Sequence, residues 1–473
     1  MRVDRIAIVV LWLTASAAGA QEPLVIRKHL TAADAFMTRY LYVPFDVPAG
    51  TTHVEFEYAY DRANGANVID LGLMEPGSLA LGTTAFRGWT GGERAGAFVA
   101  VDDATPGYWP GPIPAGLWHV QLGLYKVGPA GVDVDVTVRT SRGTVGATPA
   151  LPARTAEPLK RETRWYSGGL HAHTLHSDGK VSAAELARLA REAGLDFLAI
   201  TDHNNTAHQR ERIDVPGLLV ITGEEVTTPG GHANVWGLSG ERAFVDFRVL
   251  PGDPSMQSVV DQARAQGALV SINHPYADCF ACTWTHAVPQ DLDAIEISNP
   301  GASNLALAIG LWDSLLREGR RITAVGASDW HRAGQQPIGT ASVRVWADEL
   351  STTAILNGIR QRRVVVMADG QTPPPAFTVK AAGQTAEIGQ ELSVGPGAEL
   401  TIEVGCDGAA YAGGRVDLVW RGEVVAQAPV PASGPLRFTR WANADGYLRV
   451  HVYTAAGAPL ALTNPVFMTL QGR

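Results

Sequence analysis

Hydrophobic and polar positions alternate with a period of two at both ends of the chain. The run 54–60 places Val, Phe, Tyr and Tyr at every second position, and the run 400–404 repeats this pattern with Leu, Ile and Val. Side chains with this period share one face of a strand, and turns rich in Gly and Pro, such as PGYWPGPIPAG, separate the runs. We therefore expect a β-sandwich over residues 21–145 and a second β-sandwich over residues 376–473.

The pattern between these regions changes to alternating helices and strands. The segment SAAELARLAREAG starts with Ser182 and Glu185 at the spacing of a capping box, carries one apolar face and stops at Gly194. A short apolar run, FLAIT, follows, and further helix candidates occur in SVVDQARAQG and LALAIGLWDSLLREG. This repetition predicts a barrel-like α/β domain over residues 165–370, preceded by a Pro- and Ala-rich linker over 146–164.

Polar side chains capable of binding metal stand where the predicted strands of the middle region end. Nine of the 13 histidines lie between residues 171 and 331. The C-terminal ends of barrel strands meet at one mouth, and imidazole and carboxylate groups buried together are costly unless something pairs them. Any one of these histidines alone is equally well explained as a surface or capping residue, but the set predicts a metal site. The positions concerned are His171 and His173, Asp202 and His203, Glu224 and Glu225, His232, His274, Asp329 and His331.

The motifs HAHTLHSDG, ITDHNN, TGEEV, GGHANVWG, INHP, EISN and GASDWH occur in this order over residues 165–370. Together they resemble the polymerase and histidinol phosphatase (PHP) superfamily of metal-dependent hydrolases. The NPG after EIS, the segment GTASVRVWA and the final TNPVFM are similar to a subgroup that includes a bacterial carbaryl hydrolase. The resemblance implies a distorted (β/α)7 barrel of the TIM type that holds two or three divalent ions, which would be zinc, manganese or iron.

The resemblance also assigns ligands to three ions. The first ion would take His171, His173 and Asp329; Glu225 would bridge to a second ion held by His232 and His274; and the third would take Asp178, His203 and His331. Glu224 would face the other way on its strand, as a surface carboxylate or as one behind the ligands. His176 is expected to hold no metal, because the aspartate of S-D-G is the more frequent ligand in the family.

Such ions lower the pKa of a bound water toward about 7 and polarise the oxygen of the group under attack. Asp329 is the candidate catalytic residue, which would orient this water or take its proton. The superfamily resemblance favours phosphate esters, nucleotides among them, whereas the subgroup resemblance favours carbamates, esters or amides. Arg332, Asn204 and Tyr276 are candidate substrate contacts, although Arg332 is equally well an exposed arginine. A non-catalytic binding protein of the cell envelope is a third hypothesis, and the complete ligand set speaks against it.

Residues 1–20 join a charged start to an apolar run and end in small residues, which is typical of a cleavable secretory signal peptide. We therefore expect a periplasmic or secreted protein without a membrane segment after cleavage; an uncleaved anchor is the alternative. The formal charge of −9 disfavours binding to long nucleic acids and leaves a small molecule as the expected partner. The sequence makes no prediction of oligomeric state.

The insert ADCFACTWTHAVPQ is a candidate lid over the mouth of the barrel. In an oxidising compartment, Cys279 and Cys282 are expected to form a local disulfide, ahead of free thiols and of a metal-binding pair. His208 is expected to face solvent, and His286 to have no role in the site.

Overall fold

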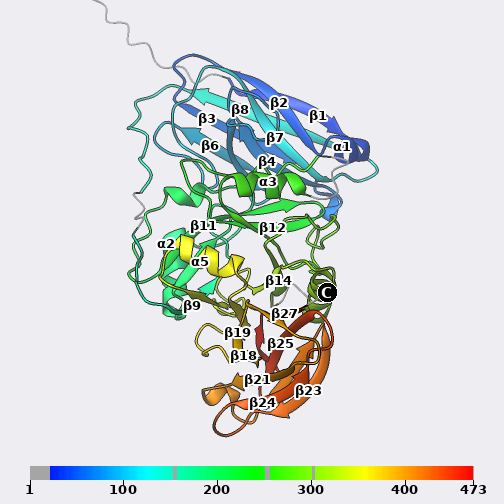
Figure 1. Ribbon diagram of the computed structural model, residues 1–473. Coiled ribbons are helices and arrows are strands. Elements are labelled where there is room, and N and C mark those ends of the chain that lie inside the picture. Colours follow the sequence, from blue (N-terminus) through cyan, green and yellow to red (C-terminus); the bar gives the residue numbers. More distant parts are fainter. Residues whose placement is uncertain (1–21, 153–156, 251–255, 301–303, 472–473) are drawn as a thin grey trace, which may run out of the picture.

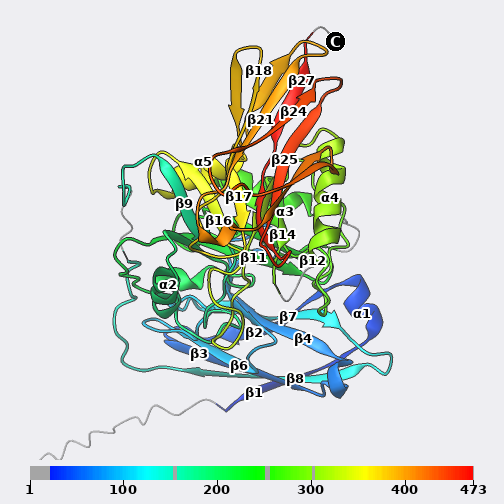
Figure 2. The same ribbon diagram turned by 90° about the horizontal axis from the view of Figure 1, so that it is seen from below.

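The computed structural model describes residues 22–152, 157–250, 256–300 and 304–471. Three parts follow one another along the molecule: N-terminal strands, a middle part that contains most of the helices, and C-terminal strands (Figures 1 and 2). The predicted signal peptide lies outside the described residues. Among the described residues, no helix is both long enough and apolar enough to cross a membrane.

Two four-stranded antiparallel sheets form the N-terminal part and share one buried core. The alternation seen in the sequence has a direct cause, because Val54 and Phe56 of one sheet and Leu71 and Leu122 of the other are buried in that core. A short helix, α1 (Ala32–Met37), connects the first two strands. In spatial order the sheets are β1 (Leu24–Leu30), β8 (Val132–Ser141), β3 (His53–Tyr60) and β6 (Gly96–Ala100), and β2 (Tyr40–Val47), β7 (Gly116–Lys126), β4 (Val68–Met74) and β5 (Phe86–Gly91).

The middle part has the strand order β15-β14-β13-β12-β11-β10-β9-β16-β17. Neighbours are parallel from β9 to β11 and from β13 to β15, whereas β12, β16 and β17 pair antiparallel with their neighbours. The strands are β9 (Arg164–Gly169), β10 (Phe197–Ile200), β11 (Leu219–Thr228), β12 (Gly231–Trp236), β13 (Leu269–Ile272), β14 (Ala294–Ser298), β15 (Thr323–Gly326), β16 (Val343–Ala347) and β17 (Val364–Met367).

The middle part departs from a complete (β/α)7 barrel in two respects. Strands β11 and β12 form a hairpin with no helix between them, and no ladder joins β15 to β17 among the described strands, so the sheet is not closed by hydrogen bonds. The predicted helices are present as α2 (Ala183–Glu192), α3 (Gln257–Ala265) and α4 (Leu305–Arg317), and α5 (Thr352–Arg360) follows β16. At the start of α2, Ser182 accepts a hydrogen bond from the Glu185 N–H, but the Glu185 carboxylate binds Arg188, so only half of the capping box forms.

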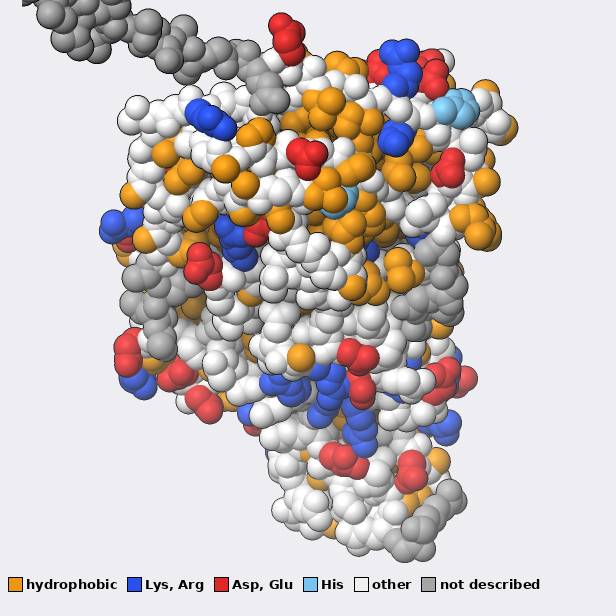
Figure 3. Space-filling model, turned by 90° about the horizontal axis from the view of Figure 1, so that it is seen from above, with side chains coloured by type: hydrophobic (Ala, Val, Ile, Leu, Met, Phe, Trp, Pro, Cys, Tyr) orange, Lys and Arg blue, Asp and Glu red, His pale blue; other side chains and the backbone are white. Residues whose placement is uncertain are grey.

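The C-terminal part also has two sheets, one of which continues the sheet of the middle part, because β17 pairs with β26. A buried core lies between the two sheets. One is β19 (Gln384–Glu387), β18 (Ala376–Ala381), β21 (Glu399–Gly405) and β24 (Leu436–Trp441); the other contains β20 (Glu391–Val394), β22 (Arg415–Trp420), β23 (Glu423–Pro429), β25 (Gly446–Tyr453), β26 (Pro459–Thr463) and β27 (Val466–Leu470). Acidic and basic side chains are interspersed over the face of the molecule shown in Figure 3.

A buried asparagine bridges the gap between β15 and β17. Asn464, in the turn between β26 and β27, accepts a hydrogen bond of 2.8 Å from the Ala324 N–H. Its amide donates to the carbonyl oxygens of Ala324, at 2.8 Å, and Val364, at 3.0 Å. One C-terminal side chain thus takes the place of ladder bonds where the strands of the middle part do not pair.

Replacing Asn464 with alanine is expected to destabilise the protein by about 2–4 kcal/mol, because it leaves the buried N–H and C=O of Ala324 without their partner. Urea unfolding followed by far-UV circular dichroism measures the change. Asn357→Ala is the control, since Asn357 is exposed on α5 and is expected to cost no more than about 0.5 kcal/mol. Equal losses for the two variants would contradict the role given to Asn464.

Candidate metal centre

The nine predicted ligands come together at the strand ends of the middle part. Glu225 lies on β11 and His232 on β12, and the others lie in the loops that follow β9, β10, β13 and β15. They form four overlapping groups, in each of which one nitrogen or oxygen per residue lies within 4.8 Å of the others. The groups are His173, Asp178, His203 and His331; His171, His173 and Glu225; His171, His274 and Asp329; and His203, Glu225 and His232.

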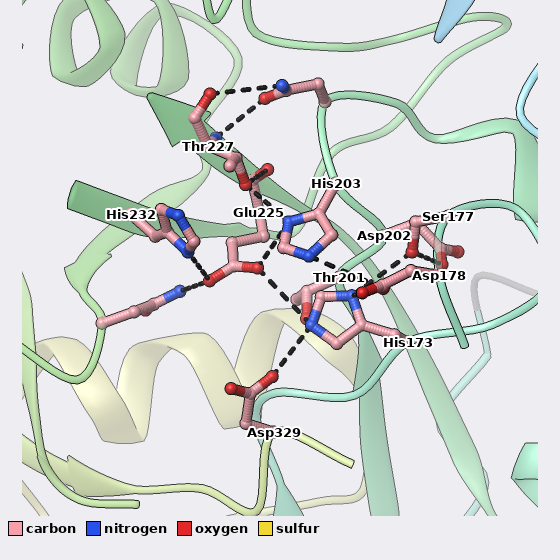
Figure 4. Close-up of polar contacts among 12 residues, drawn as sticks. His173, Ser177, Asp178, Thr201, Asp202, His203, Glu225, Thr227, His232 and Asp329 are labelled. Atoms are coloured by element: carbon pink, nitrogen blue, oxygen red, sulfur yellow. Dashed lines mark hydrogen bonds and ion pairs between the residues drawn. The ribbon is translucent and has the colours of Figure 1, made fainter. Parts of the chain in front are cut away.

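Glu225 lies at the centre of this cluster (Figure 4). Its carboxylate oxygens are 2.8–3.4 Å from nitrogens of five histidines, and the Asn273 amide donates to Oε1 at 2.8 Å. Oε1 faces His171 Nε2, His232 Nδ1 and His274 Nε2, and Oε2 faces His173 Nε2 and His203 Nδ1. The position agrees with the bridging role that the resemblance implies for this residue.

The Nε2 atoms of the two histidines in the HAH motif point toward each other and toward Asp329. His171 Nε2 and His173 Nε2 are 3.1 Å apart, and Asp329 Oδ1 is 3.2 Å from the former and 3.0 Å from the latter. Neutral imidazoles offer a lone pair at the nitrogen that carries no proton, so two such nitrogens beside a carboxylate are the donor set of a cation. Zinc, manganese and iron all accept these ligands.

Asp178 completes the group on the far side of His173. Its Oδ1 is 3.3 Å from His331 Nε2 and 3.6 Å from His203 Nε2, and it is buried without hydrogen-bond geometry to either. The glycine of the S-D-G motif allows this approach, since a Cβ at Gly179 would lie 2.4 Å from the His173 backbone. A buried oxygen that faces two imidazoles without hydrogen bonds fits a metal ligand.

The grouping differs in detail from the expected assignment to three ions. His232 shares a group with His203 and Glu225, whereas His274 shares one with His171 and Asp329. The cause is the antiparallel hairpin β11–β12, which brings His232 alongside the end of β10. The division of the nine side chains among the ions remains a prediction.

Two of the nine are held in left-handed backbone conformations. His274 has φ 23° and Asp329 has φ 47°, in a region that side chains other than glycine rarely adopt. Such conformations cost about 1–3 kcal/mol each and persist where the surroundings fix them. The chain is therefore strained at the points where it places these two groups.

Glu296, which we did not predict as part of the site, supports His171 from behind. Its Oε2 lies 2.9 Å from His171 Nδ1, so that Nε2 is directed at Glu225 and Asp329. Metal-binding histidines usually donate their second N–H to a carboxylate in this way. A glutamate in the middle of the buried strand AIEIS was the available signal, because a charge there needs a partner.

A second buried carboxylate, Asp202, holds the loop that carries His173 and Asp178. It accepts hydrogen bonds of 2.7 Å from the Thr174 N–H, the Thr174 hydroxyl and the Ser177 hydroxyl. His208 Nδ1 lies 3.1 Å from the same carboxylate. The prediction that His208 faces solvent is wrong, because its ring is buried against Asp202.

Burial and the close charges of the cluster raise the pKa of one histidine and lower that of another. Burial acts to lower the pKa of His203, but the Glu225 and Asp178 carboxylates outweigh it and raise this pKa to about 9. Burial and the neighbouring His331 and His203 lower the pKa of His173 to about 4. Burial alone would raise the pKa of Glu225, yet the surrounding histidines hold it well below its usual range.

Glu224 and Glu225 point to opposite sides of β11, as predicted. A surface position for Glu224 is wrong, however, because the side chain is buried and accepts a 2.7 Å hydrogen bond from the Val245 N–H. Burial raises the pKa of Glu224 well above its usual range. Adjacent glutamates thus have opposite ionisation tendencies, and only Glu225 faces the histidines.

His176 lies outside all four ligand groups. Its Nδ1 accepts a 3.0 Å hydrogen bond from the Gly107 N–H of the N-terminal part, and its Nε2 lies 3.0 Å from Glu211 Oε1. We expect His176→Ala to leave the metal content nearly unchanged while Asp178→Ala lowers it by about one ion per chain. Metal analysis of the two purified variants checks this, and the reverse result would contradict the account of the loop.

The three candidate substrate contacts have different environments. Arg332 is exposed beside His331, and Tyr276 is exposed two residues beyond His274. Asn204 is buried with its amide directed to the backbone: Thr227 N–H donates to its Oδ1 at 2.8 Å, and its Nδ2 donates to the Thr227 carbonyl at 3.2 Å. Asn204 therefore joins β10 to β11, and its polar atoms are occupied.

A cavity of about 260 Å³ opens beside the cluster, between two parts of the chain. Asp178, His203 and His232 form one side of it, and strands β4, β5 and β7 of the N-terminal part contribute to the other. Phe280 and Ala281 of the predicted lid also line it. The predicted disulfide between Cys279 and Cys282 is present within this segment.

No model of a protein family matches the chain, and no curated protein matches its sequence. Among solved structures, a two-domain protein from Bacteroides vulgatus, described as containing a predicted PHP-like metal-dependent phosphoesterase, shares 18% identity over 67% of this chain and all of its own, with a TM-score of 0.37. A putative metal-dependent phosphoesterase from Bifidobacterium adolescentis shares 17% identity over 42% of this chain and 98% of its own, with a TM-score of 0.28. An amidohydrolase from Chromobacterium violaceum shares 17% identity over 36% of this chain and 89% of its own, with a TM-score of 0.25. At these TM-scores the similarity does not establish the family.

Proposed function

We propose that the protein is a metal-dependent hydrolase of small molecules, with phosphate esters as its first candidate substrates. The observation that carries this proposal is the cluster of six histidines and three carboxylates, which lies beside a cavity of about 260 Å³. Divalent ions held there would supply a water of lowered pKa and a Lewis acid for the attacked group. The hydrolysis then needs no nucleophilic side chain.

The charge of the cluster favours an anionic substrate. Its three carboxylates, Asp178, Glu225 and Asp329, carry three negative charges. With two divalent ions bound, the cluster would have a net charge of +1, and with three ions a net charge of +3. A phosphate group would therefore be attracted to the cluster.

We propose that Asp329 orients the attacking water or accepts its proton. Its carboxylate is 3.0 Å from His173 Nε2, and its side chain is 17% exposed, so that water can reach it. Burial alone would raise the pKa of Asp329, but His171, His173 and His331 hold it well below its usual range. The group is thus ionised and able to orient a water or to accept its proton.

The cavity wall supports a second candidate, the hydrolysis of carbamates, carboxylic esters or amides. The residues described on this wall include no lysine or arginine, and Arg332 is not among them. A phosphate would therefore have only the ions and the histidines as positive partners. A neutral carbamate, ester or amide needs no positively charged side chain on the wall.

A substrate panel on metal-loaded protein separates these candidates. Zinc, manganese or iron(II) would be supplied, and 4-nitrophenyl phosphate, acetate and N-methylcarbamate compared, with Glu225→Gln as the inactive control. We expect the phosphate to be cleaved with the highest kcat/KM. Cleavage of the carbamate or acetate alone would favour the second candidate, and no cleavage by protein that binds metal would overturn the hydrolase proposal.

We further propose that the protein is exported to the periplasm or secreted. Support comes from the apolar start of the sequence and from the disulfide between Cys279 and Cys282, since disulfides persist in oxidising compartments. N-terminal sequencing of protein recovered from the periplasm and the medium tests this. A chain that begins at Gln21 is the expected result, and an intact chain in the cytoplasm would contradict it.

A further inference from the structure

One acidic side chain of the N-terminal part is buried at the wall of the cavity without a partner. Asp70, on β4, is 9% exposed and lines the cavity together with Gly91 and Gly92. Its carboxylate oxygens lie beside these glycines, since a Cβ at Gly92 would be 3.4 Å from Oδ1 and a Cβ at Gly91 would be 3.6 Å from Oδ2. Within the described part of the chain, Asp70 makes neither a hydrogen bond nor an ion pair.

A carboxylate in this situation is costly to the protein alone. Burial raises the pKa of Asp70 to about 7, although the charges of His203 and Arg62 act in the opposite direction. Buried charges in proteins are normally paired. A ligand in the cavity that donates a hydrogen bond or carries a positive charge would supply the missing partner.

The rest of the wall fits a cationic group better than an anionic one. Its other acidic residues are Glu93, which pairs with Lys180, and the predicted metal ligand Asp178. Three aromatic side chains, Trp89, Tyr125 and Phe280, line the same cavity, and Lys126 Nζ already lies 5.6 Å from the ring centroid of Phe280. Aromatic faces attract cations, so the carboxylate together with Trp89 and Tyr125 describes a site for an ammonium group.

Hydrogen bonds through Thr227 connect Tyr125 of this wall to His203 of the cluster. The Tyr125 hydroxyl donates a 2.6 Å hydrogen bond to the Thr227 carbonyl, and the Thr227 hydroxyl lies 2.5 Å from His203 Nδ1. The N-terminal part is therefore joined to a residue that contacts one of the metal-binding histidines. Asp70 and the cluster residues Asp178, His203 and His232 line the same cavity.

We propose that Asp70 is a specificity-determining residue that binds an ammonium or other N–H group on the substrate, while the scissile group lies at the cluster. This inference rests on the proposed hydrolase function and names the substrate class, a small ester whose leaving group carries an amine. The N-terminal β-sheets then contribute to the active site instead of only flanking it.

The test compares two phosphate esters that differ in this group, 2-aminoethyl phosphate and ethyl phosphate, on metal-loaded full-length protein. We expect the wild type to cleave the amine ester with a kcat/KM roughly 10-fold or more above that of the alkyl ester, as a charge-assisted hydrogen bond would give. Asp70→Asn is expected to remove this preference, lowering the rate on the amine ester roughly 10-fold and that on the alkyl ester less than about 2-fold. Asp46→Asn, an exposed position on β2 of the same sheet, is the matched control and should keep the preference.

Equal losses on both esters in Asp70→Asn, or no preference in the wild type, would overturn the inference. Calorimetric titration with benzylammonium and with benzyl alcohol gives a readout that needs no activity. If neither phosphate is cleaved, the phosphoesterase proposal fails, and the titration still decides the role of Asp70. Binding of benzylammonium that is lost in Asp70→Asn and kept in Asp46→Asn supports it, and binding unaffected by Asp70→Asn, or no binding, contradicts it.

Discussion

Glu225→Gln is expected to lower metal-dependent hydrolysis by roughly 1,000-fold, since metal ions supply several kcal/mol of transition-state stabilisation and each 1.36 kcal/mol is a factor of ten. The reason lies in the geometry, because this one carboxylate faces five histidines at 2.8–3.4 Å. An amide nitrogen cannot replace the second carboxylate oxygen as a ligand. Metal analysis and kcat/KM, measured on the same preparation, should therefore fall together.

The neighbouring glutamate provides the matched control. Glu224 is also buried and lies on the same strand, but it accepts a hydrogen bond from the Val245 N–H and faces away from the histidines. Its raised pKa favours the neutral form, which glutamine mimics, so Glu224→Gln should keep metal content and activity within about 2-fold of the wild type. A large loss of bound metal in Glu224→Gln, or full activity in Glu225→Gln, would contradict the account of this strand.

Asp329→Asn is expected to have the second large effect, a fall in kcat of about 100-fold to 10,000-fold. Asparagine keeps one oxygen as a ligand but cannot accept a proton, so metal content should fall by less than one ion per chain. Steady-state kinetics at saturating metal checks this, with metal analysis of the same variant. The exposed Asp348, changed to Asn, is the control for loss of a carboxylate in this part of the chain.

The two readouts distinguish the roles of Asp329. A loss of kcat without loss of metal supports its function in proton transfer. A proportional loss of both would leave it a ligand only, and an unchanged kcat would exclude it from catalysis.

The sequence was sufficient to predict which side chains meet at the cluster. Each predicted ligand stands at or near the end of a short apolar run, and strand ends that share one edge bring such residues together. Strand alternation predicted only that Glu224 and Glu225 face opposite sides, and the family resemblance indicated Glu225 as the ligand; in the structure Glu225 is the one that faces the histidines. Position at the strand ends thus predicted that these residues meet, whereas the resemblance was needed to choose Glu225 over Glu224 and Asp178 over His176.

Contacts between distant segments were not predictable in the same way. Even over a short distance the fold was needed, because His208 has the local sequence of a surface turn and the loop after β10 turns it back onto Asp202, six residues earlier. The gap between β15 and β17 is bridged by Asn464, which lies 140 residues after Ala324 and 100 residues after Val364. Asp70 follows the strand alternation of its sheet, and nothing local shows that the cavity of another part lies against it.

For a related reason, the interruption of the βα repeat was not predicted. Apolar runs separated by polar turns do not show whether neighbouring strands are parallel. The hairpin β11–β12 has a two-residue turn, Pro229-Gly230, which leaves no room for a crossover helix. This short turn was the signal that the regular βα repeat is interrupted.

Counting and locating bound metal tests the central claim most directly. Full-length protein loaded with zinc, manganese or iron(II) and then freed of excess ion would be analysed by mass spectrometry, and the ions located by anomalous diffraction. The account predicts two or three ions per chain, all bound by the nine predicted ligands, of which Glu225 is one. Fewer than one ion per chain under all three loadings, or ions bound elsewhere, would contradict it.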